Sequence, residues 1–150
     1  AGNRWSAAHI FLTAATGAPY DLASTGDPRD YADLLTPAGL RALRRGGIDG
    51  IGPSKLQVIP VRDDGSLGLP TSLVADAHRA RLLVHPYTFR AENVFLPPAL
   101  RIGSDPSAFG RAIDEQVAYW QTGIDGMFTD HPDVAVVSRQ VSTEPVRRAA

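Results

Sequence analysis

The chain has 150 residues, of which 43% are hydrophobic and 21% are charged, and its 15 basic and 16 acidic residues leave a formal net charge of −1. Length and composition suit one globular domain, and a charge so near zero excludes nucleic-acid or membrane binding driven by the net field, although it leaves room for a local basic patch. The absence of cysteine excludes disulfides, thiolate metal ligands and cysteine nucleophiles. No apolar run reaches the ~18 residues of a membrane span. The sequence begins with Ala1, so we expect any targeting signal to lie upstream.

The first half of the chain predicts a strand, a long loop, a helix and a second strand. Residues 8–13 are a nearly continuous apolar run, which is typical of a strand covered on both faces. Residues 14–35 contain two glycines and two prolines and predict a loop. A Thr-Pro cap and a Gly-Gly stop bound a helix over 36–47, and 48–52 is a short apolar strand.

The second half repeats this alternation. A helix capped by Thr71 or Ser72 precedes the strand 81–87, and a second long loop covers 88–105. The longest predicted helix opens at Asp105-Pro106, stops at Gly123 and has one apolar face made of Phe109, Ile113, Val117 and Trp120. A fourth strand over 124–129 and a last helix capped by Asp133 complete the domain.

The spacing of the strands indicates a barrel. Predicted strands start near 8, 48, 81 and 124, at intervals of 40, 33 and 43 residues. Eight such units make about 300 residues, the size of a (β/α)8 barrel, and four make half of one. Two identical segments (Gly-Ile-Asp-Gly), 47–50 and 123–126, each join a helix to a strand, which favours a shared turn chemistry over a ligand site. In parallel α/β folds the loops that follow the strands carry the ligand site.

No complete catalytic motif is present. The sequence has no phosphate-binding loop, no GxGxxG, no HExxH and no GxSxG, and its four histidines are not spaced as metal ligands. His9, within a strand, and His78, near a helix end, are expected to be structural.

The strongest candidate segment follows the third strand. His85 ends this strand, Tyr87 can offer a flat face with a hydroxyl, and Arg90 can pair an anionic oxygen through two donors. A hydrogen-bonded core histidine with a solvated arginine is the alternative, and the position at a strand end favours a functional site.

Two further charged residues lie past strand ends. Asp130 can bind a hydroxyl or orient a cation, or it can simply cap the next helix, and the sequence leaves both open. Lys55 follows the second strand and can reach a phosphate, but a lysine in such a loop is usually solvated, so we expect Lys55 to be solvated.

Three segments together resemble one family. They are Tyr31–Pro37 with Ile48–Pro53, then Val84–Arg90 (VHPYTFR), and then Gly126–Asp133 (GMFTDHPD). In this order they resemble the C-terminal half of the glycerophosphodiester phosphodiesterases, and in particular the branch that acts outside the bacterial cytoplasm. The resemblance covers about residues 8 to 138. It implies a (β/α)8 TIM barrel of which this chain is the C-terminal half, strands five to eight.

The resemblance also implies a reaction. The family hydrolyses glycerophosphodiesters to an alcohol and glycerol 3-phosphate with a divalent metal, typically calcium, held by carboxylates, and with two histidines as general acid and base. A periplasmic or extracellular location follows from the branch that the chain resembles.

The catalytic motifs of the family are missing from this chain. Its His-Arg motif and its metal-binding Glu motifs belong to the first half of the barrel, so no catalytic residue and no metal ligand is expected among residues 1–150. What carries over is the His85–Arg90 segment as the lip of the substrate pocket, with Tyr87 against the alcohol moiety. We add Asp130, which ends the next strand, as the fourth substrate-binding candidate.

Isolation of a half barrel has a physical cost. Two open sheet edges and an uncovered inner face favour association, so the expected partner is the N-terminal half of the barrel, or a second copy if the chain is isolated. Two alternatives remain: a non-catalytic four-unit α/β module that binds an anionic small molecule, and a related barrel phospholipase. Neither nucleic acid nor a membrane span is expected.

Overall fold

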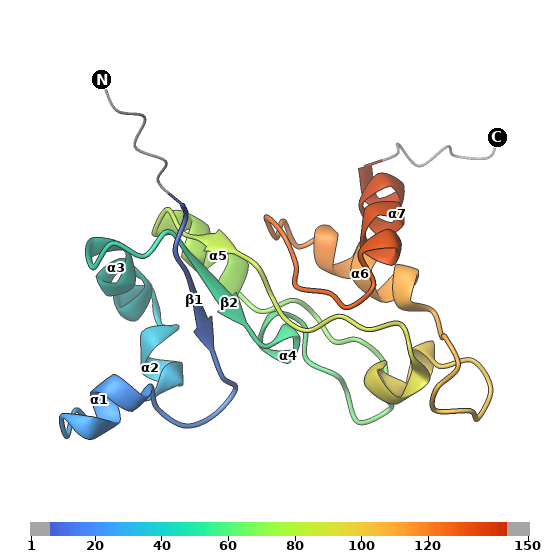
Figure 1. Cartoon of the computed structure of the whole chain (residues 1–150), viewed down its shortest axis with the longest axis horizontal. Coiled ribbons are helices and arrows are strands. Elements are labelled where there is room, and N and C mark those ends of the chain that lie inside the picture. Colours follow the sequence, from blue (N-terminus) through green and yellow to red (C-terminus); the bar gives the residue numbers. More distant parts are fainter. Residues whose placement is uncertain (1–6, 144–150) are drawn as a thin grey trace.

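A parallel sheet of three strands forms the centre of the computed structural model, which describes residues 7–143 (Figure 1). Strand β1 covers Ile10–Thr13, β2 covers Gly50–Pro53 and β3 covers Leu83–Val84. The strand order is β1-β2-β3. Three of the predicted strands are therefore confirmed: β1 and β3 are shorter than predicted, and β2 ends one residue later, at Pro53. Their carboxyl ends lie at the same end of the sheet.

The fourth predicted strand, over 124–129, is not a regular strand, although it runs alongside the continuation of β3. The amide of Phe128 donates to the carbonyl of Pro86 at 3.0 Å, and Phe89 pairs with Thr129 in a single parallel bridge. Pro86 lies within this contact and has no N–H to donate, so a continuous ladder cannot form. The segment occupies the place of a fourth strand without its regular hydrogen bonding.

Helices lie between these segments. Four match predicted helices: α3 (Pro37–Arg45), α5 (Leu73–Arg79), α6 (Ala112–Trp120) and α7 (Pro132–Thr143). The short elements within the predicted loops and after β2 are new: α1 (Tyr20–Ser24), α2 (Tyr31–Leu34), α4 (Lys55–Val58), and the 3-10 turns η1 (Asn93–Phe95) and η2 (Pro98–Leu100). None of the helices within residues 7–143 is both long and apolar enough to cross a membrane.

The start of α3 is confirmed and the start of α6 is wrong. Thr36 caps α3 by accepting the amide of Gly39 at 3.1 Å, with proline at the first helical position. Helix α6 begins at Ala112 rather than at Asp105, because the Asp105 carboxylate accepts the backbone amide of Ser107 at 2.9 Å and its hydroxyl at 2.7 Å. The Asp105 carboxylate, which was expected to cap a helix, is thus used in this local turn.

The buried face of α6 also differs from the predicted one. Phe109 precedes the helix and is 58% exposed, and Ile113 is 38% exposed. The side chains that face the interior are instead Ala112, Glu115, Gln116 and Tyr119. The apolar spacing therefore identified the helix but not its orientation.

The last helix begins one residue before its predicted cap. Asp133 is the second residue of α7, and the Thr129 hydroxyl accepts the amide of His131 at 3.0 Å just ahead of the helix. An acidic residue in the first turn still interacts favourably with the helix dipole.

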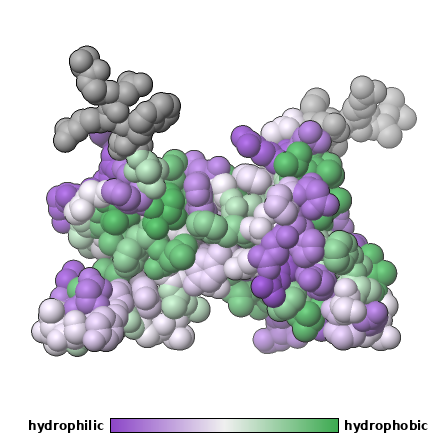
Figure 2. Space-filling model, in the orientation of Figure 1, coloured by the Kyte–Doolittle hydropathy of each residue, from purple (hydrophilic) through white to green (hydrophobic). Residues whose placement is uncertain are grey.

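The core lies on one face of the sheet, and the other face is open. Leu40, Ile51 and Tyr119 are fully buried where α3, α5 and α6 pack against the strands. On the opposite face Leu12 is 54% and Phe128 42% exposed, and Figure 2 shows apolar surface gathered over β1 and β2. Within the described residues β1 pairs only with β2. One sheet face and one strand edge are thus uncovered in residues 7–143.

The repeated segments 47–50 and 123–126 have a structural role, as predicted. Asp49 and Asp125 each accept the backbone amide of a residue in the neighbouring strand region, His9 at 3.1 Å and Val84 at 2.8 Å. Each also has a cationic or imidazole partner, Arg44 of α3 at 2.6 Å for Asp49 and His78 of α5 at 2.9 Å for Asp125. The His9 amide, followed by Arg44, holds the pKa of Asp49 below its ordinary value.

Gly39 provides a test of the packing between α2 and α3. A Cβ atom at this position would overlap the carbonyl oxygen of Asp33 and lie 2.6 Å from the carbonyl carbon of Leu34, whereas a Cβ at Gly46 would lie 3.4 Å or more from its neighbours. We expect Gly39→Ala to lower the free energy of unfolding by about 1–3 kcal/mol, although alanine is the better helix former.

The matched control is Gly46→Ala, which should change stability by less than about 1 kcal/mol. Urea denaturation followed by circular dichroism measures both variants. Equal stability of the two would contradict the close packing of α3 against α2.

Candidate functional site

The carboxyl ends of the parallel strands bring the predicted site residues to one edge of the sheet. Thr13 ends β1, Lys55 follows β2, and the segment from His85 to Arg90 follows β3. The neighbouring 124–130 segment ends in Asp130. In Figure 1 this edge lies at the lower side of the sheet, opposite the start of β1.

Arg90 and Asp130, both predicted, form an ion pair. The Arg90 Nε atom lies 2.6 Å from Asp130 Oδ2, and the two side chains are 38% and 47% exposed. The guanidinium also stacks over the Phe95 ring, with its central carbon 4.4 Å from the ring centroid. The Nε side of the guanidinium is thus held by Asp130, and no other residue in 7–143 hydrogen bonds to its remaining N–H groups.

Tyr87 bridges two strands at the same edge. Its hydroxyl donates to the Thr13 carbonyl at 2.8 Å, which carries the side chain across the end of β2 to β1. Its backbone amide donates to Pro53 and its carbonyl accepts from Lys55. Tyr87 is therefore fixed at both ends, with its ring half-buried at the site.

His85 lies on the open face rather than in the core. Its ring is edge-on to Phe128, with centroids 6.3 Å apart, and it covers Gly126, where a Cβ would lie 2.9 Å from Nε2. No other residue of the described part hydrogen bonds to this ring. His85 is therefore not a hydrogen-bonded histidine of the core, and any substrate role of His85 stays a prediction.

Lys55 is not solvated, which corrects the expectation from its sequence position. Its side chain is 12% exposed, its Nζ atom lies 2.7 Å from Glu115 Oε1, and it donates to the Phe95 carbonyl at 3.1 Å. The same ammonium lies 5.5 Å from the Phe89 ring centroid. Lys55 thus joins α4 and α6 to the Phe95 turn that supports Arg90.

Burial governs the ionisation of this cluster. Glu115 is fully buried, and desolvation raises its pKa above the ordinary value, although the charge of Lys55 and its hydrogen bond oppose the shift. Burial, and then the charge of Glu115, also raise the pKa of Tyr119, whose hydroxyl donates to the Lys55 carbonyl at 2.9 Å. The Oε2 atom of Glu115 has no hydrogen-bond partner in the described structure.

The described residues do not fit a metal ion. Residues 7–143 contain no group of three or more histidine, aspartate or glutamate side chains able to hold one. Of the carboxylates near this end of the sheet, Asp130 is paired with Arg90 and Glu115 with Lys55, while one buried oxygen of Glu92 has no hydrogen-bond partner in the described structure. No chemical step is therefore assigned to a metal held by these residues.

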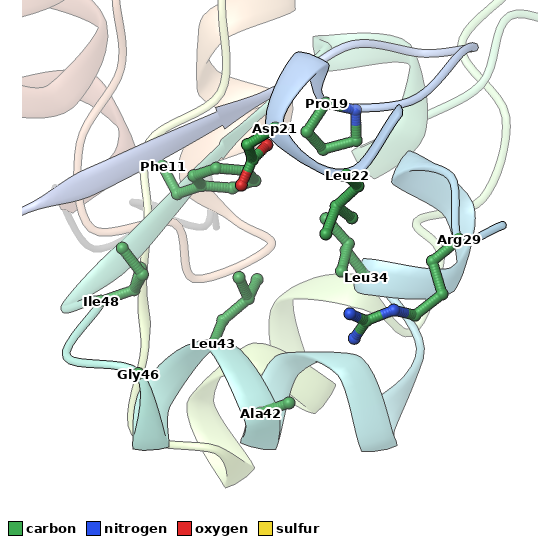
Figure 3. A pocket seen from close by; sticks show the side chains of 10 residues that line it. All are labelled: Phe11, Pro19, Asp21, Leu22, Arg29, Leu34, Ala42, Leu43, Gly46 and Ile48. Atoms are coloured by element: carbon green, nitrogen blue, oxygen red, sulfur yellow. The ribbon is translucent and has the colours of Figure 1, made fainter. Parts of the chain in front are cut away.

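A separate cavity of about 310 Å³ lies outside β1, between this strand and helices α1 to α3 (Figure 3). Phe11, Leu22 and Leu43 point into it, and its charged lining groups are Asp21 and Arg29. Its described lining contains no paired acid and base of the kind that catalysis needs. It shares no residue with the carboxyl end of the sheet where Arg90 lies, which we call the Arg90 edge.

Comparison with known proteins identifies the family. The model of the glycerophosphoryl diester phosphodiesterase family matches residues 9–134. The chain belongs to this family. It is also 40% identical over 104 residues to the glycerophosphodiester phosphodiesterase GDPD6 of Arabidopsis thaliana, a match that covers 68% of this chain and 25% of the relative. The chain spans about a quarter of the length of that relative. Family membership implies a TIM-barrel-like α/β fold, in agreement with the parallel sheet.

Sequence reasoning missed the residues that support the Arg90–Asp130 pair. The apolar spacing of the predicted helix puts Glu115 outside its buried face, whereas Glu115 is buried. Phe95 falls in the loop predicted over 88–105, where the structure has the 3-10 turn η1. One signal was available for Lys55. It is the only lysine in a chain with 14 arginines, so its residue type is unusual here.

Replacement of Lys55 by methionine should expose the cost of burying Glu115. Removing Lys55 leaves Glu115 buried without its cation, so we expect Lys55→Met to lower the free energy of unfolding by about 3–5 kcal/mol at pH 7. It also removes the groups that lower the Glu115 pKa, which therefore rises further above 4.5. The folded state then binds more protons than the unfolded state, so the deficit should grow as pH rises from 4 to 7.

Urea denaturation at pH 4 and pH 7 measures this difference. The double variant Lys55→Met/Glu115→Gln is the control, because it removes the buried charge and should recover part of the loss at pH 7. A deficit that is identical at both pH values would rule out an ionised Glu115 as its cause.

Proposed function

We propose that this chain is the C-terminal half, strands five to eight, of a (β/α)8 glycerophosphodiester phosphodiesterase. Hydrolysis would give an alcohol and glycerol 3-phosphate. The observation that carries the proposal is that Tyr87 and the Arg90–Asp130 ion pair lie at the carboxyl end of the sheet, in a chain that matches the family model over residues 9–134. The open sheet face and the free edge of β1 support the half-barrel assignment.

The residues of this chain have binding and orienting roles in this proposal. Arg90 directs its free N–H groups to a phosphoryl oxygen, while Asp130 and Phe95 hold the guanidinium in place. Tyr87 presents an aromatic surface to the alcohol moiety, and His85 lines the inner face beside Phe128. These contacts position the phosphodiester and exclude water from one side of it.

The groups that perform the chemistry are proposed to lie in the other half of the barrel. There a divalent ion, which we propose to be calcium, would be held by carboxylates and would polarise the phosphoryl oxygens. We further propose a periplasmic or extracellular location, on the resemblance to that branch of the family.

The first test is whether residues 1–150 are inactive on their own. The purified chain, mixed with calcium and glycerophosphocholine, should release no glycerol 3-phosphate in a coupled enzymatic assay, and co-expression with the N-terminal half of the barrel should restore release. Turnover by the chain alone would show that catalytic groups lie within it, and a complemented barrel without activity would contradict the proposed reaction.

The second test concerns Arg90 in the complete barrel. Arg90→Ala should lower kcat/KM roughly tenfold to a hundredfold, because one charge-assisted contact to the phosphoryl group is lost. Arg29→Ala is the matched control, since Arg29 forms an exposed pair with Asp27 at the same 2.6 Å separation but lies outside the edge. Equal effects of the two variants on steady-state kinetics would remove the case for Arg90.

A further inference from the structure

Two adjoining hollows lie at the end of the sheet opposite the Arg90 edge. One, of about 380 Å³, is lined by Ala8, Arg44, Asp49, Arg81 and Leu83. The other, of about 250 Å³, is lined by Arg41, Arg44, Arg45, Arg79, Ala80 and Arg81. They share Arg44 and Arg81, and we call them together the arginine hollows. They lie where α3 and α5 end and where β2 and β3 begin, at the upper side of the sheet in Figure 1.

Positive charge is concentrated at the arginine hollows. They gather five of the 15 basic residues of a chain whose formal net charge is −1. Two of the five are paired, Arg44 with Asp49 at 2.6 Å and Arg79 with Asp76. The side chains of Arg41, Arg45 and Arg81 have no ion pair or hydrogen bond to any residue in 7–143. Five guanidinium groups against two carboxylates leave a strong local field of one sign.

The helix dipole explains only part of this cluster. Arginines in the last turn of a helix interact favourably with its carboxyl end, which accounts for Arg44, Arg45 and Arg79. Arg41 and Arg45, however, are four residues apart on α3, where like charges repel. The sequence thus retains a destabilising pair whose two charges both face one hollow.

The backbone at Arg81 is a second, independent observation. The turns after α3 and α6 place Gly47 and Gly123 in the left-handed region, at φ 91° and 88°. The corresponding turn after α5 places Arg81 there, at φ 61°, and Arg81 is the only described residue other than glycine with a positive φ. A side chain at such a position is strained, and glycine avoids the strain at the two related turns. Strained backbone positions cluster at functional sites, so an arginine at this position, rather than glycine, supports a role for its side chain.

We propose that the arginine hollows bind a phosphate-type oxyanion. Guanidinium groups pair with phosphate oxygens through two parallel N–H donors, and both hollows are shallow and open to solvent, so an anion can reach them. Among residues 7–143, no aromatic side chain lines them, so the described lining has no stacking surface for the bases of a single strand. The anion can come from a free phosphate or from a phospholipid headgroup, and the two sources share this chemistry.

The decisive variant is Arg81→Gly, which removes the side chain and relieves the backbone strain. It should raise the melting temperature and, at the same time, weaken anion binding about tenfold, the share expected of one charge-assisted contact. Because a more stable variant cannot lose binding through unfolding, the two readouts separate a binding role from a structural one. Arg62→Gln is the control, since Arg62 is exposed and outside both hollows.

Two arms of the experiment distinguish the sources of the anion. Titration of the 150-residue chain with inorganic phosphate, followed by thermal shift, tests a free anion. Flotation with vesicles of phosphatidylcholine alone, or with phosphatidylglycerol added, tests a lipid headgroup, and flotation separates bound protein from aggregates. Binding in either arm that Arg81→Gly weakens and Arg62→Gln preserves supports the site. The absence of binding in both arms, or equal binding by both variants, overturns it, because the general stabilisation that phosphate gives proteins affects both variants alike.

Discussion

Glu115 is fully buried, and the charge that compensates it comes from Lys55, 60 positions earlier in the chain. A buried carboxylate without a cation is costly, so α6 can pack against the sheet in this orientation only if Lys55 lies beneath it. Lys55 in turn donates to the Phe95 carbonyl, and the Phe95 ring supports the Arg90 guanidinium. The ion pair therefore connects the packing of the core to the position of the proposed substrate lip.

The two glycines of β2, Gly50 and Gly52, shape the open face of the sheet. A Cβ at Gly52 would overlap the side chain of Leu12 and lie 3.4 Å from the Phe128 ring, and a Cβ at Gly50 would lie 2.6 Å from Ile10. Side chains of the neighbouring segments, Ile10, Leu12 and Phe128, thus fill the space above β2, which has no side chains of its own on this face. The resulting surface is apolar and continuous, which is typical of a layer that packs against something else rather than of a face built for water.

Local sequence patterns predicted most of the helices and strands. Contacts between residues remote in sequence determine which face of a helix is buried and which side chains meet at the candidate site, and local patterns do not contain this information. The Thr36 cap and the apolar runs of three strands are readable because their causes lie within a few residues. The face of α6 is not, because Glu115 is paired with Lys55 and the Gln116 side chain accepts a hydrogen bond from Ser138, both remote in sequence. At the candidate site the types and order of residues were predictable, whereas the Arg90–Asp130 pair needed the alignment of two separate loops.

The exposure of the Arg90–Asp130 pair favours a binding role over a structural one. An ion pair that is more than a third exposed on both sides contributes at most about 1 kcal/mol to stability, because water screens the attraction. Such a pair costs little to loosen, so in the proposed reaction the phosphodiester would replace Asp130 at part of the guanidinium while Phe95 keeps it oriented. The buried Lys55–Glu115 pair cannot be exchanged in this way, because each charge would be left desolvated. The two ion pairs at this end of the sheet thus differ in role: the buried one stabilises the structure, and the exposed one is accessible to the substrate that we propose.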